Sequence, residues 1–244
     1  MAGKKCGSSH MLGTGVATLS YQLGHRVKFI DTEGVRGFLP PKGVEWMRSG
    51  GGAWHLAELD DDPVAPKAED YTGFQLWIAL PPKVEDGPSF SQFVAPEDVP
   101  TVSAESITVR VLSGQFKGAI SPIRDVPADS IDTLDVTVSP GASFAHTFRT
   151  GHSTSWAVVY AGDARVNGQL VPCNELLIFE GSGDSISIEN VGQCDAGVLV
   201  GSAAPHPFPL ITKNASVHTN EASMKDGWKR IKQIGNELHA KGFI

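Results

Sequence analysis

The chain has 244 residues and a formal net charge of −7 at pH 7. This length suits one large or two medium domains, and the acidic balance excludes a general electrostatic attraction to nucleic acid or to anionic membranes. No apolar run approaches the ~20 residues of a spanning helix, and the beginning lacks the apolar core of a signal peptide. We therefore expect a soluble, intracellular protein with no membrane span and no direct binding of nucleic acid.

The first half of the chain has the pattern of short β-hairpins. The sequence holds 27 glycines and 16 prolines, and apolar and polar residues alternate between these turn residues, which is typical of strands. Strands are expected at residues 17–23, 26–31, 37–40 and 44–47, followed by an apolar strand at residues 73–81 with Trp77 in the core. The composition therefore predicts an all-β fold.

The second half repeats this pattern after a connecting segment. Residues 81–100 are rich in proline and charge, which is typical of a connection between domains. Many short strands at regular spacing then predict a closed jelly-roll barrel. The expected strands are residues 107–114, 132–138, 143–148, 155–160, 163–166, 175–179, 185–189 and 196–200.

The chain ends in a different pattern. Apolar residues recur at helical spacing between residues 220 and 240, which predicts an amphipathic helix. Asn220 or Thr219 can supply its N-cap. Gly227 or Gly235 is expected to interrupt it, because glycine is unfavourable inside a helix.

Three segments resemble the pirin family. Residues 44–55 (Val-Glu-Trp-Met-Arg-Ser-Gly-Gly-Gly-Ala-Trp-His) resemble the pirin strand Val-Gln-Trp-Met-Thr-Ala-Gly-Arg-Gly-Ile-Val-His, and residues 73–81 resemble the signature Gly-Leu-Gln-Leu-Trp-Val-Asn-Leu-Pro. Residues 15–21 match the second half of the family's Pro-His-Pro-His-x-Gly-x-x-Thr-Val-Thr-Tyr. The resemblance implies an all-β fold of two tandem cupin (jelly-roll) barrels, the first incomplete, with a C-terminal helix. It also implies that the second barrel lacks the metal ligands, so His146 and His152 are expected at the surface or in hairpins.

The resemblance also implies where a metal would bind. Pirins hold iron with the His-x-His pair of one segment and with a His and a Glu at the end of another, and these four positions are Met11, Gly13, His55 and Ala57 here. His55 is the only in-register ligand. Because an Fe(II) oxygenase of the facial type needs two histidines and a carboxylate, we expect a degenerate site and no metal cofactor, with Fe(II) as the cofactor if the first-barrel site is functional.

A shifted metal site is the alternative. His10 is adjacent to the first lost ligand position and Glu58 to the last, so His10, His55 and Glu58 are candidate ligands. Two observations count against them. Side chains alternate faces along a strand, so a slip of one residue turns a ligand away. In addition, residues 7–11 (Gly-Ser-Ser-His-Met) resemble a remnant of an expression tag, in which case His10 is not native.

These patterns predict a domain organisation. The expected parts are an N-terminal stub at residues 1–15, a partial pirin-like cupin barrel at 16–82, a linker at 83–104, a second pirin-like cupin barrel at 105–205, and a tail with the amphipathic helix at 206–244. The first barrel is expected to be partial because the strands that precede the His-x-His pair in pirins have no counterpart here. An open sheet edge invites association, so we expect protein partners to cover it.

Two functions follow from the resemblance. The first is a non-catalytic, protein-binding scaffold or assembly subunit that has lost the iron site and has no catalytic residues. The second is an iron-dependent oxidoreductase of the quercetin 2,3-dioxygenase type, in which a carboxylate ligand can serve as base. Ala57 at the carboxylate position favours the first.

Overall fold

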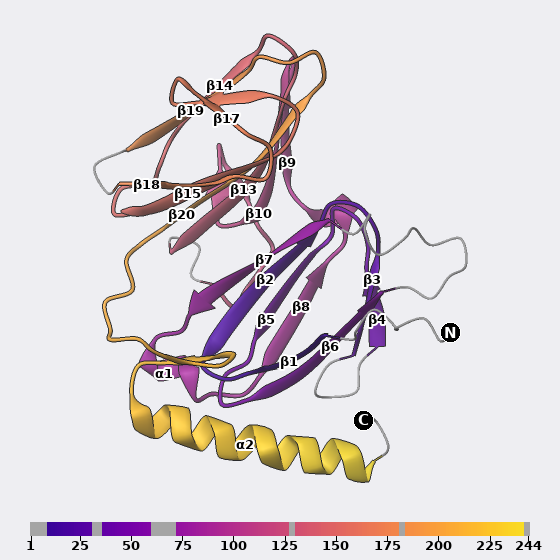
Figure 1. Cartoon of the computed structure of the whole chain (residues 1–244), viewed down its shortest axis with the longest axis vertical. Helices are drawn as coiled ribbons and strands as arrows, with labels where there is room; N and C mark the ends of the chain where they lie inside the picture. Colours follow the sequence, from indigo (N-terminus) through magenta and orange to yellow (C-terminus); the bar gives the residue numbers. More distant parts are fainter. Residues whose placement is uncertain (1–8, 31–35, 60–71, 127–129, 181–183, 242–244) are drawn as a thin grey trace. The chain divides into compact units, whose positions relative to one another are not determined.

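The computed structural model describes residues 9–30, 36–59, 72–126, 130–180 and 184–241. The chain divides into two compact units (Figure 1), of which the first comprises Met1–Pro96 and His206–Ile244 and the second Glu97–Pro205. The C-terminal tail therefore belongs to the same unit as the N-terminal half.

The first unit is built on two four-stranded antiparallel sheets. Strands that follow one another in sequence often lie in different sheets, as in a jelly roll. One sheet has the order β1 (Ser9–Gly13), β6 (Ala53–Leu59), β3 (Val27–Ile30), β4 (Arg36–Leu39), and the other the order β7 (Gly73–Ala79), β2 (Val16–Gln22), β5 (Val44–Arg48), β8 (Phe90–Val94). A short helix α1 (Pro82–Glu85), the hairpin β21 (Ile211–Lys213) to β22 (Ser216–His218), and helix α2 (Glu221–Ala240) complete the unit.

Two of these strands lie where the sequence predicts other structure. Strand β1 falls within the predicted stub and pairs with β6, and β8 falls within the predicted linker and pairs with β5. Both are edge strands of their sheets. An edge strand has a neighbouring strand on one side only. Its alternation of polar and apolar residues is therefore weaker than that of a central strand.

The second unit holds a continuous hydrophobic core. Its main sheet has six strands and faces a four-stranded sheet and a small hairpin. The six strands run in the order β18 (Leu176–Phe179), β15 (Thr154–Ala161), β20 (Ala196–Ala203), β13 (Ile131–Val138), β10 (Ile107–Ser113), β9 (Thr101–Ala104). The four strands of the second sheet run in the order β14 (Ser143–Thr147), β19 (Ser185–Asn190), β16 (Ala164–Val166), β17 (Gln169–Val171). The hairpin consists of β11 (Gln115–Phe116) and β12 (Ala119–Ile120). The predicted all-β fold of two jelly-roll barrels with a C-terminal helix is confirmed.

Helix α2 is continuous, so the predicted interruption at Gly227 or Gly235 is wrong. Both glycines lie where the helix closely approaches the first barrel. A Cβ at Gly227 would lie 2.6 Å from Oγ1 of Thr14, and one at Gly235 would lie 2.7 Å from the ring of Trp54. Close packing therefore explains the two glycines, and the gain in contact offsets their low helix propensity.

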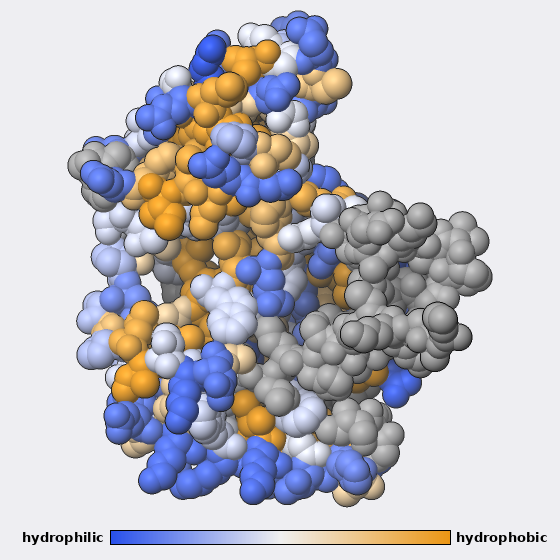
Figure 2. Space-filling model, viewed as in Figure 1, coloured by the Kyte–Doolittle hydropathy of each residue, from blue (hydrophilic) through white to orange (hydrophobic). Residues whose placement is uncertain are grey.

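The ends and faces of α2 agree with the sequence pattern. The side chain of Asn220 accepts a hydrogen bond of 2.9 Å from Ser223 N, as an N-cap does. Met224, Ile234 and Leu238 are buried on the inner face, while the outer face is largely hydrophilic (Figure 2). No helix in the described part of the chain has the length and apolar character needed to cross a membrane.

Trp77 is not a core residue, contrary to the sequence prediction. Its side chain is 47% exposed, and its indole N–H donates a hydrogen bond of 3.0 Å to Gln75 Oε1. The reason is its place in the sheet, because β7 is an edge strand. The apolar pattern of such a segment is the same for a central strand and for an edge strand, so the sequence does not distinguish the two.

Candidate functional site

The four family ligand positions meet on paired strands of the first unit. In the register of β1 and β6, Met11 lies opposite His55, Gly13 opposite Ala53, and Ala57 opposite Ser9. Because alternate residues of a strand share a face, and directly opposed residues of paired strands share it too, positions 11, 13, 55 and 57 lie on one face. The residues at these positions are Met, Gly, His and Ala.

The shifted candidates occupy the alternate positions. His10 lies opposite Leu56, and Glu58 lies opposite Lys28 of β3. By the alternation of a strand, positions 10 and 58 belong to the face opposite to that of His55. The shifted site of His10, His55 and Glu58 therefore stays a prediction that this register does not favour.

A different carboxylate approaches His55. Glu45, on β5 of the facing sheet, places its Oε1 3.5 Å from Nε2 of His55, and the two residues are 4% and 5% exposed. The family pattern does not predict Glu45 as a site residue. The sequence does contain one indication: Glu45 is acidic, whereas the pirin segment Val-Gln-Trp-Met has glutamine at this position.

Aromatic rings fill the interior beside this pair. Phe29 lies opposite Ala57 in the β3–β6 register, and its ring centroid is 6.3 Å from that of His55 in a stacked arrangement. The ring of Phe93, opposite Glu45 on β8, stacks on Phe29 at 4.0 Å. Two phenylalanine rings therefore lie in the interior on the same side of the sheet as His55.

The residues present at this site do not fit a facial iron centre. Such a centre needs two imidazoles and a carboxylate with open positions for substrate and oxygen. In the part of the chain that the structure describes, one imidazole, that of His55, and one carboxylate, that of Glu45, face each other there. The neighbouring ligand positions hold no second histidine, and Phe29 stacks beside them.

A second group of ionisable side chains lies elsewhere in the first unit. Glu85 at the end of α1, the adjacent Asp86, and His218 at the end of β22 place one nitrogen or oxygen each within 4.8 Å of one another. Nδ1 of His218 is 3.6 Å from Glu85 Oε2 and 3.6 Å from Asp86 Oδ1. Burial lowers the pKa of His218, and the carboxylates of Glu85 and Asp86 partly oppose that effect. Their separation in sequence explains why no motif points to this group.

Hydrogen bonds hold the two carboxylates of this group. Glu85 accepts from the backbone N–H of Thr219 at 2.7 Å and from its hydroxyl at 2.6 Å. Asp86 Oδ2 accepts from the hydroxyl of Ser223 at 2.6 Å. The end of α1 is thereby connected to the first turn of α2.

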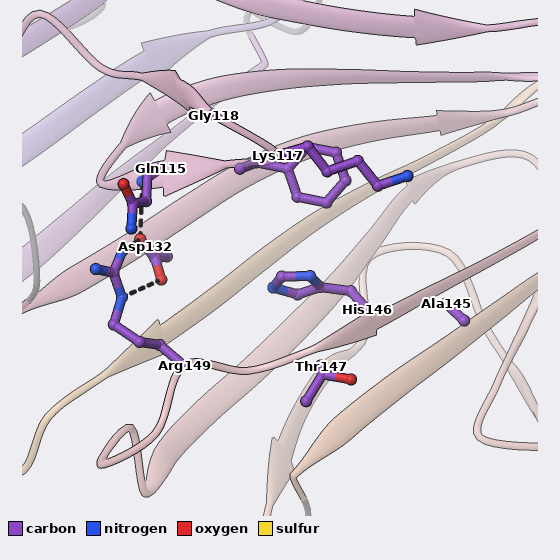
Figure 3. A pocket seen from close by; sticks show the side chains of 9 residues that line it. Gln115, Lys117, Gly118, Asp132, Ala145, His146, Thr147 and Arg149 are labelled. Atoms are coloured by element: carbon purple, nitrogen blue, oxygen red, sulfur yellow. Dashed lines mark hydrogen bonds and ion pairs between the residues drawn. The ribbon is translucent and has the colours of Figure 1, made fainter.

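The second unit contains a pocket of about 320 Å³ (Figure 3). On one side, Arg149 donates to both oxygens of Asp132, at 2.7 and 3.2 Å, and His146 projects from β14 on the other side. Burial lowers the pKa of His146, the nearby Asp132 opposes this, and Lys117 adds to it. Asp132 and Arg149 neutralise each other, and Lys117, which also lines the pocket, adds a positive charge.

The two histidines of this unit differ in their surroundings. His152 is buried, and its Nδ1 lies 2.9 Å from the hydroxyl of Ser202, so the prediction that it lies at the surface is wrong. Ser202 lies on β20, 50 residues away in sequence, so local sequence does not reveal this contact. His146 is half-buried and contacts the ring of Phe116 at a centroid distance of 5.4 Å.

The sequence and the fold are similar to those of known proteins. The family model described as "Pirin" matches residues 9–78. A pirin-like protein of Caulobacter vibrioides is 30% identical over 199 residues, which cover 80% of this chain and 68% of that protein. Human pirin is 27% identical over 242 residues, covering 91% of this chain and 80% of that protein.

Solved structures show the same architecture. A crystal structure of quercetin 2,3-dioxygenase from Acinetobacter baumannii superposes with a TM-score of 0.78 at 20% identity, covering 94% of this chain and 78% of that one. At this identity the likeness concerns the fold, which is the cupin fold.

Proposed function

The chain belongs to the pirin family, and from this premise we propose that it is a non-catalytic member that has lost the iron site of its first barrel and acts as a protein-binding scaffold or assembly subunit. The observation that carries the proposal is the set of residues on the ligand face of β1 and β6. That face has His55 with Met11, Gly13 and Ala57 around it. Three of the four ligand side chains are thus replaced by groups that do not suit Fe(II).

The surroundings of His55 support the loss of catalysis. Metal-dependent oxygenation needs open coordination positions beside the metal, and the rings of Phe29 and Phe93 stack in this part of the barrel. The partner of His55 is a buried carboxylate, that of Glu45. A buried pair of this kind is suited to hold two facing sheets together.

The binding part of the proposal rests on the edge strand β7. Gln75 and Trp77 lie opposite Ser20 and Thr18 of β2, in the cross-strand rows that continue to Glu45 and Met47. They therefore belong to the inner face of the sheet, and both are exposed at its edge. An edge strand with an exposed tryptophan suits a protein partner, because the partner can pair with the backbone and bury the indole.

Loss of the iron site is tested by metal retention. After anaerobic reconstitution with Fe(II) and desalting, we expect the wild-type chain and the His55→Ala variant to retain the same amount of iron and neither to turn over quercetin. Mass spectrometry of the metal and an oxygen-consumption assay measure the two quantities. Stoichiometric iron that disappears in His55→Ala, together with turnover that disappears with it, would overturn the proposal.

The binding role is tested by site-specific cross-linking. A photoreactive amino acid at position 77 is expected to cross-link to one protein in an extract of the source organism. The matched control is position 120, because Ile120 is 55% exposed but lies in the other unit. A defined adduct at 77 that is absent at 120 supports a partner on β7. Equal labelling at both positions, or none at 77, contradicts it.

One observation favours the alternative, an iron-dependent oxidoreductase of the quercetin 2,3-dioxygenase type. Glu45 brings a carboxylate to within 3.5 Å of His55 and could replace the ligand lost at Ala57. In that case Glu45→Gln lowers iron retention as strongly as His55→Ala does. Equal iron in all three proteins excludes this alternative.

A further inference from the structure

We propose that Glu85, Asp86 and His218 form a binding site for a divalent transition-metal ion, with Zn²⁺ as the best match, between α1 and the N-terminus of α2. The site is separate from the ligand face of β1 and β6, and it goes beyond the proposed function of the chain. Its residues come from α1, the residue that follows it, and β22, and all belong to the first unit.

The distances suit a shared ion better than direct hydrogen bonds. Nδ1 of His218 is 3.6 Å from Glu85 Oε2 and from Asp86 Oδ1, which is longer than the ~2.7–3.2 Å of an N–H···O bond. Zinc bonds to nitrogen and oxygen are about 2.0–2.2 Å long and tetrahedral, so two ligand atoms on one zinc ion lie about 3.4 Å apart. A small movement of the side chains would bring all three atoms onto one ion.

A buried nitrogen gives an independent indication of a ligand. The side chain of His218 has 0% relative exposure, and its Nδ1 has no hydrogen-bond partner. Buried polar atoms are nearly always paired, so an unpaired one needs a physical reason. This nitrogen faces two carboxylate oxygens at equal distances, and a metal ion between them would satisfy all three atoms.

The surroundings of His218 favour ligation through Nδ1. Its other ring nitrogen, Nε2, is hydrogen-bonded to the hydroxyl of Thr14. With the proton on Nε2 donated to this hydroxyl, the lone pair of Nδ1 is directed toward the carboxylates, which is how a second hydrogen bond orients a metal-binding histidine. Gly15 makes room for the ring, because a Cβ there would lie 2.8 Å from Nδ1.

The carboxylates are held in place by hydrogen bonds. Thr219 and Ser223 orient them through hydrogen bonds. Within the described residues, the ion pairs of Glu85 and Asp86 are made with His218 and not with a lysine or arginine. A buried carboxylate needs a compensating charge, which a divalent cation would provide. The side chain of Asp86 is 52% exposed, so an ion can enter from solvent and keep a water molecule as its fourth ligand.

The proposed ion would connect three segments that are distant in sequence. Glu85 ends α1, His218 ends β22, and the residues that bond the carboxylates lie at the start of α2. Binding to this folded arrangement, which the unfolded chain lacks, would stabilise the docking of α2 on the first barrel.

The test is Zn²⁺ binding by the full chain after removal of metals with EDTA and desalting. We expect saturation at one equivalent in calorimetry and a melting temperature that rises with the Zn²⁺ concentration. Asp86→Asn should weaken binding by at least about tenfold, since it removes one ligand charge from a half-exposed side chain. The matched control is Asp226→Asn, because Asp226 is an exposed aspartate of α2 outside the site; it should bind Zn²⁺ as the wild type does.

Two further measurements distinguish this site from a metal site on the ligand face of β1 and β6. His55→Ala should leave Zn²⁺ affinity unchanged, whereas a site on that face would lose it. With Co²⁺ as the probe, the wild type should show the absorption bands of a tetrahedral nitrogen–oxygen site, and Asp86→Asn should not. The absence of saturable binding, or binding that Asp86→Asn leaves unchanged, would overturn the proposal.

Discussion

Replacing Arg149 with leucine is expected to lower the free energy of unfolding of the second unit by about 3 kcal/mol, at the low end of the range for breaking a buried ion pair. Arg149 donates two hydrogen bonds to Asp132, whose side chain is 5% exposed. Without the guanidinium group, this carboxylate stays buried with the backbone N–H of Gln115 as a hydrogen-bond donor. The cost arises mainly from the lost guanidinium charge, which only His152, with Nδ1 3.7 Å from Asp132 Oδ2, could partly replace by taking up a proton.

The control for this prediction is Arg165→Leu. Arg165 and Glu189 also form an ion pair, at 3.8 Å, but their side chains are 47% and 52% exposed. Solvent screens such pairs, so this substitution should cost less than about 1 kcal/mol. Hydrogen exchange of second-unit amides in increasing urea measures both values. Equal losses in the two variants would show that burial does not decide the effect.

The second large effect is expected from Ile188→Ala, which should cost about 3 kcal/mol. Ile188 is fully buried in the core of the second unit. On β19 it pairs with Phe144 on one side and with Val166 on the other. Truncation removes methyl groups from packed surroundings that can collapse only partly, so the loss includes a cavity term.

Ile178→Ala makes the same chemical change at an exposed site. Ile178 lies on the edge strand β18 with 76% of its surface exposed, so its truncation should change stability by no more than about 0.5 kcal/mol. The same exchange measurement compares the two variants. A small loss in Ile188→Ala would mean that this core is loosely packed.

The two ionisable clusters of the first unit differ in their access to solvent. His55 and Glu45 belong to facing sheets, and both side chains are buried. The group of Glu85, Asp86 and His218 lies where α1, β22 and α2 meet, and one of its carboxylates reaches solvent. The proposed loss of the family's metal at the first position and the proposed ion at the second are independent of each other, and His55→Ala and Asp86→Asn test them separately.

The sequence by itself determined the local elements. Alternation predicted a strand at residues 44–47, which the structure extends by one residue to Val44–Arg48. Helical spacing predicted α2 with an N-cap at Asn220 or Thr219, and Asn220 is the cap. Such features depend on the contacts of a residue with its near neighbours, and these contacts repeat with the period of a strand or a helix. The family motifs likewise placed the four ligand positions, which the β1–β6 register brings to one face.

The tertiary structure alone decided which distant residues meet. Glu45 faces His55 because two sheets stack, and Glu85 meets His218 because the chain returns to the first unit after completing the second. Trp77 is exposed because its strand lies at an edge, and Gly227 is tolerated in a helix because Thr14 lies against it. Stacking, strand order and helix docking are set by packing of the whole chain, and no periodicity within a short segment encodes them.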